Sequence, residues 1–135
     1  MSLKVTVYTP NRIVANVMTD EVFIPVEIGH FAIKKSFQKH SSAISIGLLR
    51  IKTDSSWLLF LSYGGMLEVE NDKVTIFLSD AKEIKSLTSS LSQLEDNLKQ
   101  LAQKRLIKFE NTFEKMKLLD EILKLKAYIQ AAKYL

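Results

Sequence analysis

Apolar and polar residues alternate along several short stretches in the first part of the chain. The alternation is clear in residues 3–8 and 21–28, and residues 13–18 and 43–52 have a similar β-like composition. A period of two residues is that of a strand with one buried face. These stretches therefore predict four strands. Pro25 predicts that residues 21–28 form an edge or bulged strand, because proline cannot donate to a ladder.

The stretch 57–83 adds three further β-like runs. Residues 57–62 form a continuous apolar run, too short for a helix, which is typical of a strand buried on both faces. Residues 66–70 and 74–78 are joined by Asn71 and Asp72, which tolerate left-handed turn geometry, so they predict a β-hairpin. The adjacent Gly64 and Gly65 at the junction of two runs indicate a positive φ or the close approach of a neighbouring chain segment.

Over the first 80 or so residues we expect roughly eight to ten short strands, with no helical spacing among them. Gly47 predicts a bulge or bend within one of them. Many short strands with frequent turns are typical of an antiparallel sandwich or barrel. The sequence therefore predicts a mainly β N-terminal sandwich of about ten short strands, over residues 1–85.

After Glu83 the hydrophobic period becomes helical. The apolar seam of a first helix consists of Leu87, Leu91, Leu94, Leu98 and Leu101. Ser86, or one of Thr88, Ser89 and Ser90, is expected to cap it. A second helix is expected to begin at residues 111–112, where Glu114 completes a capping-box pattern. Residues 86–135 are therefore predicted to form an antiparallel helical hairpin.

The second helix carries two apolar stripes. They are Phe113, Met116, Leu119 and Leu123, and Leu118, Ile122, Leu125 and Ile129. Together the stripes are wider than the partner in a helical hairpin would bury. The excess either packs on the sandwich or remains available to a partner, and the sequence favours neither.

Composition narrows the function classes. The chain has no cysteine, which excludes a disulfide framework, a thiolate zinc site and a cysteine nucleophile. The net charge is +4, and the excess lies in residues 86–135, with nine basic residues against six acidic ones. Either a solvated helical surface or an acidic protein partner accounts for this excess, and acidic residues dilute it too much for nucleic acid. No secretory signal and no membrane-crossing segment is expected, which predicts a protein that is soluble or peripheral to a larger assembly.

Residues 29–42 are the least regular part of the first half. They mix apolar side chains with lysines and both histidines, His30 and His40, neither of which has a carboxylate nearby in sequence. A patch that is both apolar and basic favours contact with a protein partner over catalysis or metal binding. The predicted partner-binding residues here are His30, Phe31, Lys34, Lys35, Phe37 and Lys39. No phosphate loop, nucleophile motif or metal-ligand spacing occurs, so we expect a non-catalytic protein without cofactor or metal.

Several of these segments together resemble one known family. Trp57 and residues 64–69, 74–76 and 79–83 are similar to the epsilon subunit of rotary ATP synthases. Residues 9–14 and 47–51 are similar to that family as well, at the right spacing. The resemblance covers essentially the whole chain, including its β-then-helical order.

The resemblance implies a ten-stranded sandwich, followed by two helices, on the central stalk of the motor. The sandwich would bind the gamma subunit and touch the membrane rotor ring, on the cytoplasmic side of a bacterial or plastid membrane. The helices would fold on the sandwich or extend toward the alpha and beta subunits of the catalytic head, where basic side chains slow ATP hydrolysis. Lys115, Lys117, Lys124 and Lys126 are compatible with that role.

Two departures from the family pattern leave alternatives open. Gly29, Phe31 and Ile33 match the family's ring-facing loop, but residues 34–39 do not, which puts contact with an ordinary rotor ring in question. An epsilon-like subunit of a rotary ATPase that drives another machine, such as motility, therefore remains an alternative, as does a free-standing adaptor. The family's nucleotide-binding motif is absent between Ile84 and Leu106, which predicts no ATP site.

Overall fold

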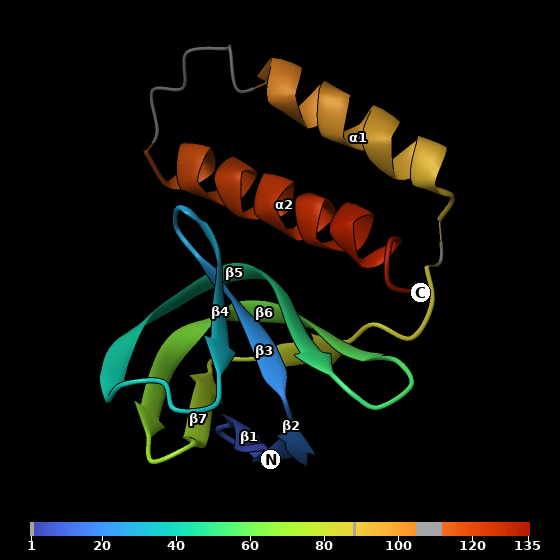
Figure 1. Ribbon diagram of the computed structural model, residues 1–135. Coiled ribbons are helices and arrows are strands. Elements are labelled where there is room, and N and C mark those ends of the chain that lie inside the picture. The colour runs from blue at the N-terminus through green and yellow to red at the C-terminus, as the bar shows by residue number, and fades with distance from the viewer. Residues whose placement is uncertain (1, 88, 105–111) are drawn as a thin grey trace.

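The computed structural model describes residues 2–87, 89–104 and 112–135. Eight strands precede two helices along the chain (Figure 1). The strands are β1 (Leu3–Thr9), β2 (Arg12–Thr19), β3 (Glu21–Val26), β4 (Gly29–Lys34), β5 (His40–Lys52), β6 (Trp57–Glu70), β7 (Lys73–Leu78) and β8 (Ala81–Glu83). The helices are α1 (Leu91–Lys104) and α2 (Thr112–Ala131).

The strands form one sheet that folds over into a sandwich. Its order is β2-β1-β7-β6-β5-β3-β4, with β8 pairing β6. The two long strands β5 and β6 belong to both layers, since β6 pairs β8 through its first half and β7 through its second half. One layer therefore contains β2, β1 and β7, and the other, called here the helix-facing layer, contains β8, β3 and β4.

This arrangement confirms the predicted sandwich followed by two helices and explains the expected strand number. The described residues form eight strands rather than about ten. Counting β5 and β6 once in each layer gives ten strand segments, which is the number that the resemblance implies. A long strand that bends between layers has the same sequence pattern as two short ones.

The separation of residues 57–62 and 66–70 into two strands was wrong. They form one strand, β6, of 14 residues. Gly64 adopts φ 93°, and a side chain at Gly65 would meet the Phe77 carbonyl oxygen at 1.8 Å. The positive φ and the close approach expected at these two glycines are therefore confirmed. They allow β6 to bend and β7 to lie close to it, and β6 continues through both residues.

The turn between β6 and β7 has the predicted conformation. Asn71 and Asp72 adopt φ 51° and 59°, as required at both central residues of a type I′ turn. Glu70 pairs with Lys73 across this turn. The hairpin prediction is confirmed.

The predictions at Pro25 and Gly47 need correction. β3 lies between β4 and β5, not at an edge. Pro25 is tolerated because the β3–β5 ladder covers Val22 and Phe23 and stops before the proline. The β5–β6 register is unshifted around Gly47, so the bulge predicted there is wrong, while the alternative of a bend stays a prediction. The glycine leaves room for Pro25, whose Cβ would lie 2.8 Å from a Cβ at position 47.

The main core lies between the two layers. Leu3, Val5 and Val74 come from one layer and Val22 and Ile33 from the other, and all are fully buried. The helix-facing layer is covered on its second side as well, because Leu48, Leu59 and Leu61 pack against the end of α2 in a separate cluster. This double burial confirms the interpretation of residues 57–62 as a strand with two buried faces.

The two helices lie side by side, with α2 between α1 and the sheet (Figure 1). α1 begins later than the leucine seam predicts, because Leu87 packs against the cluster under α2. Ser90 caps the helix: its hydroxyl accepts from the Gln93 amide, and the Gln93 side chain accepts from the Ser90 amide. α2 begins at Thr112, close to the expected start, while Asn111 lies outside the described residues.

The two stripes of α2 have different environments. Leu118 and Ile122 are buried, whereas Phe113 is 72% exposed and Met116 is 60% exposed. Part of the apolar excess therefore packs within the molecule and part remains on the surface. Neither α1 nor α2, as described here, is long and apolar enough to span a membrane.

Candidate interaction surfaces

The segment 29–42 is more regular than the sequence predicts. Gly29–Lys34 form strand β4 and His40 begins β5, so only residues 35–39 connect them. The expectation of an irregular loop was wrong. Among the described strands β4 pairs only with β3, and Ile33 is its one buried residue, which leaves little hydrophobic pattern to read. Adjacent residues of a strand point to opposite faces of the sheet, so the side chains of His30 and Phe31 lie in different surroundings.

Three rings gather where β4 leads into β5. Phe31 contacts Phe37 and His40 edge-on, with ring centroids 5.4 and 5.2 Å apart, and Phe37 lies 6.0 Å from His40. Phe31 and Phe37 also pack on the main core. Edge-to-face rings stabilise each other beyond simple burial. The cluster therefore holds residues 35–39 in place at this end of the sandwich.

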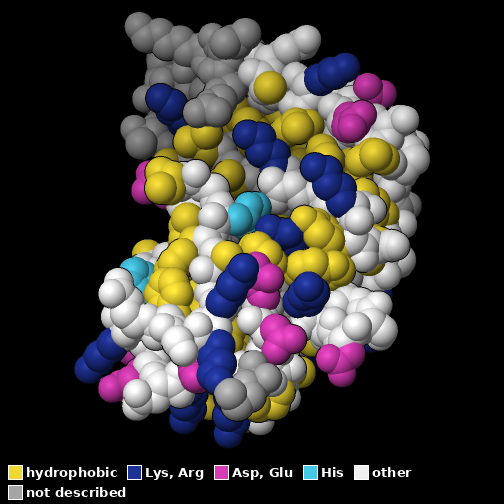
Figure 2. Space-filling model, in the orientation of Figure 1, with side chains coloured by type: hydrophobic (Ala, Val, Ile, Leu, Met, Phe, Trp, Pro, Cys, Tyr) yellow, Lys and Arg dark blue, Asp and Glu magenta, His cyan; other side chains and the backbone are white. Residues whose placement is uncertain are grey.

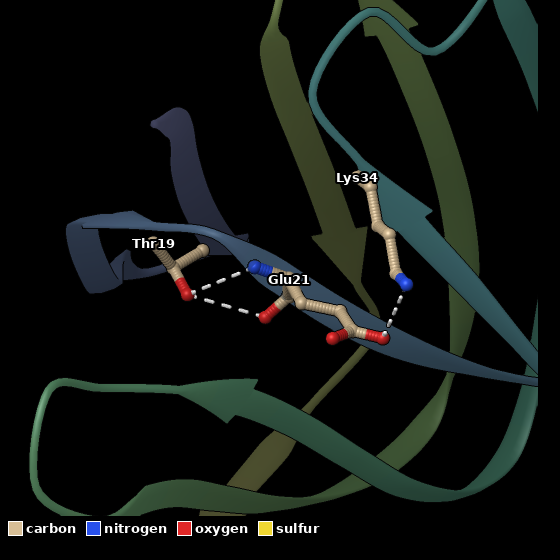
Figure 3. A network of polar contacts seen from close by, with 3 residues as sticks. All are labelled: Thr19, Glu21 and Lys34. Atoms are coloured by element: carbon tan, nitrogen blue, oxygen red, sulfur yellow. Dashed lines mark hydrogen bonds and ion pairs between the residues drawn. The ribbon is translucent and has the colours of Figure 1, made fainter. Parts of the chain in front are cut away.

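Lys34 and Lys39 each lie near a carboxylate. The Lys34 ammonium is 3.8 Å from Glu21, its cross-strand partner on β3 (Figure 3). The Thr19 hydroxyl accepts a hydrogen bond from the Glu21 amide at 3.3 Å and fixes the start of β3. Lys39 lies 3.8 Å from Glu70. Both lysines are largely exposed, so these pairs contribute little to stability and leave the charges available to a partner.

The same end of the sandwich contains a polar groove of about 550 Å³. Its lining residues are Lys39, His40, Ser41, Glu68, Val69, Glu70, Lys73 and Thr75. Beside it, Ser36 has φ 65° and donates its amide to the Asp72 carboxylate at 2.6 Å. This bond ties the segment 35–39, including the exposed Lys35, to the β6–β7 turn.

His30 lies apart from this group, at the boundary between β4 and α2. It lines a cavity with Arg50 and Tyr134, and a second cavity with Glu27 and Lys126. Partial removal from water and then the Arg50 charge hold the pKa of His30 below its ordinary value, while a backbone hydrogen bond with Leu48 opposes them. Neutral histidine is therefore favoured here.

We expect stability to fall as the pH drops below about 6.5, the ordinary pKa of histidine. The unfolded chain binds a proton there more readily than the folded chain, so protonation favours unfolding. His30→Gln should flatten this dependence between pH 7.5 and 5.5. Urea unfolding midpoints of the two proteins measure it. Equal slopes in both proteins would show that His30 is not the responsible group.

The seam between α2 and the sheet is closely packed. Ala127 is 1% exposed and Ala131 is fully buried, so the helix backbone approaches the sheet. Lys124 lies over the Tyr63 ring at 4.8 Å, and Lys82 over the Tyr128 ring at 5.9 Å. Cation–π contacts supplement apolar burial here.

Beyond the end of α2, four residues form what we call the Arg50 cluster: Arg50, Phe23, Trp57 and Tyr134. The guanidinium carbon lies 4.2 Å from the Phe23 ring centre, 4.7 Å from that of Tyr134 and 5.6 Å from that of Trp57. Arg50 also donates a hydrogen bond to the Tyr134 hydroxyl. The cluster joins the last residues of the chain to the helix-facing layer.

The structure does not bring the predicted contact residues into one patch. Phe31, Lys34, Lys35, Phe37 and Lys39 lie on β4 or on the connection that follows it, His30 faces α2, and the other four lysines lie on the helix. Of the helical lysines, Lys124 contacts Tyr63, while Lys115, Lys117 and Lys126 are exposed. Basic side chains accordingly gather both on the helices and at the far end of the sandwich (Figure 2).

Among the residues that the structure describes, no group of three His, Asp or Glu side chains is arranged to hold a metal ion. The groove and the seam offer charged and apolar contact surfaces.

The chain is similar to known proteins over its whole length. Residues 2–84 match the family described as ATP synthase, Delta/Epsilon chain, beta-sandwich domain. The ATP synthase epsilon chain of Prochlorococcus marinus (strain AS9601) is 35% identical, over 98% of this chain and 99% of that one. The chloroplastic ATP synthase epsilon chain of Gracilaria tenuistipitata var. liui is 30% identical, over 100% and 98%.

Solved structures share the fold at low identity. A chain of the Euglena gracilis mitochondrial ATP synthase (OSCP/F1/c-ring, rotational state 1) superposes with a TM-score of 0.72 at 12% identity, over 98% of this chain and 81% of that one. A chain of the Tetrahymena thermophila mitochondrial ATP synthase central stalk/c-ring gives 0.60 at 14% identity, over 97% and 96%.

Proposed function

Because the chain belongs to the ATP synthase Delta/Epsilon chain family, we propose that it serves as the epsilon subunit of a rotary ATP synthase, a non-catalytic subunit of the central stalk. The observation that carries this proposal is the match of both parts together. Relatives named epsilon chain align over nearly their full length, helices included, at 30% identity or more. A chance similarity limited to the sandwich would not extend over the helical hairpin as well.

In this role the sandwich binds the gamma subunit and turns with it. The groove end, with Lys34, Lys35, Phe37 and Lys39, offers exposed charge and partly buried rings for a protein contact. We propose that this end faces the membrane side of the motor, where the assembly is peripheral to the cytoplasmic face. The replacements at residues 34–39 would then adjust the contact with the rotor ring.

The hairpin provides the contact with the catalytic head formed by alpha and beta subunits. Lys115, Lys117 and Lys126 are exposed and suited to acidic loops, while Phe113 and Met116 on the same helix add exposed apolar side chains. A helix whose stripes have one burial site on the sandwich and another on a partner is a two-state element. Its position would regulate ATP hydrolysis.

Purification of the native complex through an affinity tag on this chain tests the proposal. We expect gamma, alpha and beta subunits and a proteolipid ring to copurify. In that complex, Lys115→Gln with Lys117→Gln should raise ATP hydrolysis severalfold, since two charges facing the head are removed. Lys52→Gln, an exposed change on the sandwich, is the matched control and should leave the rate unchanged.

Other compositions of the purified complex would replace the proposal. Gamma and the head without a proteolipid ring would indicate a rotary ATPase that drives another machine. The chain without any motor subunit would indicate a free-standing adaptor.

A further inference from the structure

A small basic cavity lies where the end of the chain meets the sheet. Its volume is about 170 Å³, and its lining residues are His30, Leu48, Arg50, Gln130, Lys133 and Tyr134. Two cations, a histidine, a phenol and an amide converge there, and no carboxylate belongs to the lining. Such a set of donors is what a bound oxyanion requires.

The two cations are not neutralised within the part of the chain that the structure describes. The ion pairs there join Lys34 to Glu21, Lys39 to Glu70 and Lys85 to Glu83, and include neither Arg50 nor Lys133. The Arg50 guanidinium donates one hydrogen bond to the Tyr134 hydroxyl and stacks on aromatic rings. Its other N–H groups can therefore donate to an anion. Arg50 is half-buried at an apolar seam, where its charge attracts an anion more strongly than the same charge in water.

Both the Glu27 carboxylate, which lines the neighbouring cavity, and the carbonyl end of α2 oppose an anion. The effect of the helix end is reduced because the chain turns back on itself there. The amides of Lys133 and Tyr134 donate to the carbonyl oxygens of Gln130 and Ala131, at 3.2 and 3.0 Å. With these oxygens occupied, the side chains of Lys133 and Arg50 dominate the cavity.

The volume selects the class of anion. Pockets for nucleotide-sized ligands hold about 300–1,000 Å³. A cavity of about 170 Å³ has room for a tetrahedral oxyanion and a few waters, each water taking about 30 Å³. The cavity has no room for a base and a sugar in addition to the oxyanion.

We propose that this cavity binds a small inorganic oxyanion of the phosphate type, and that binding holds the helical hairpin on the sandwich. His30 and Arg50 belong to the helix-facing layer, while Gln130, Lys133 and Tyr134 belong to the end of the hairpin. An anion held by both sets stabilises the packed arrangement and binds weakly, or not at all, once the helices leave.

The surroundings of His30 support the same site. Arg50, Lys133 and Tyr134 face it in this cavity, and Glu27 and Lys126 face it in the neighbouring one. Without an anion, partial burial and then the charge of Arg50 keep the pKa of His30 low. A bound phosphate would raise that pKa, so binding should be accompanied by proton uptake below neutral pH.

Trp57 makes the proposal directly testable. It is the only tryptophan, and its ring lies 5.0 Å from that of Tyr134. The full chain is titrated with inorganic phosphate at constant ionic strength, with chloride as the balancing anion. We expect a saturable change in Trp57 emission, about tenfold weaker in Lys133→Gln and unchanged in Lys126→Gln, which lies outside this cavity.

The docking part of the proposal has its own readout. Ala127→Leu, which should displace α2 from the sheet, is expected to remove the saturable response because it separates the two sets of lining residues. A response equal in the wild type and Lys133→Gln, or one that chloride reproduces, would overturn the site. A phosphate response that persists unchanged in an Ala127→Leu protein with a displaced hairpin would overturn the coupling.

Discussion

Replacing Gly65 with alanine is expected to destabilise the sandwich by about 3 kcal/mol or more. A methyl group at this position would lie 1.8 Å from the Phe77 carbonyl oxygen and 2.8 Å from its carbonyl carbon. Both atoms are backbone atoms of β7, so no side-chain rotation relieves the clash. β7 would have to leave β6 locally, and the main core behind it would lose contacts. Equilibrium denaturation followed by circular dichroism measures the effect.

Gly29→Ala is the matched control. Gly29 has φ 136°, but a methyl group there would meet nothing within 4 Å. The cost should therefore be conformational strain alone, about 1 kcal/mol. If the two variants lost similar amounts of stability, the close approach of β7 at Gly65 would not be the reason for that glycine.

Ala127→Leu is expected to displace the hairpin while the sandwich stays folded. Ala127 is 1% exposed and lies against Leu48, Leu59 and Leu61, so there is no space for three additional carbons. Overpacking of this kind costs about 1–3 kcal/mol, and a helix in a protein owes most of its stability to the tertiary packing that this substitution disturbs. Hydrogen exchange should show fast amides in α2 and unchanged protection in β1 and β7, and Trp57 emission should shift to the red.

The same substitution at Ala102 provides the comparison. Ala102 is exposed on α1, so leucine there should alter neither exchange nor emission. Unchanged protection of α2 in Ala127→Leu would mean that the seam has more room than its buried alanines indicate.

The sandwich could be predicted because its pattern is local. Residues 57–61 are all apolar, as a strand with two buried faces requires, and Asn71 with Asp72 specifies a turn without reference to anything distant. β4 was missed because an edge strand that buries only Ile33 has almost no periodic signal. The number of strands was overestimated where a long strand changes layers, since a bend in β6 at Gly64 resembles an ending in the sequence.

The contact surfaces were predicted less well, for a physical reason. The Arg50 cluster joins residues 84 positions apart, and no spacing within a sequence indicates that a strand arginine and a C-terminal tyrosine meet. His30 was grouped with its sequence neighbours, but alternation along β4 turns it toward α2 and away from Phe31. Side chains that belong to one stretch of sequence here belong to two faces of the molecule.

The double burial of the helix-facing layer has a consequence for biogenesis. Leu48, Leu59 and Leu61 form an apolar surface that the second helix helps to cover. If that helix left the sheet before another protein could replace it, the apolar side chains beneath it would be exposed to water and the protein would tend to aggregate. The newly synthesised chain should therefore remain closed until it joins its assembly, and any open form should exist only with a substitute cover.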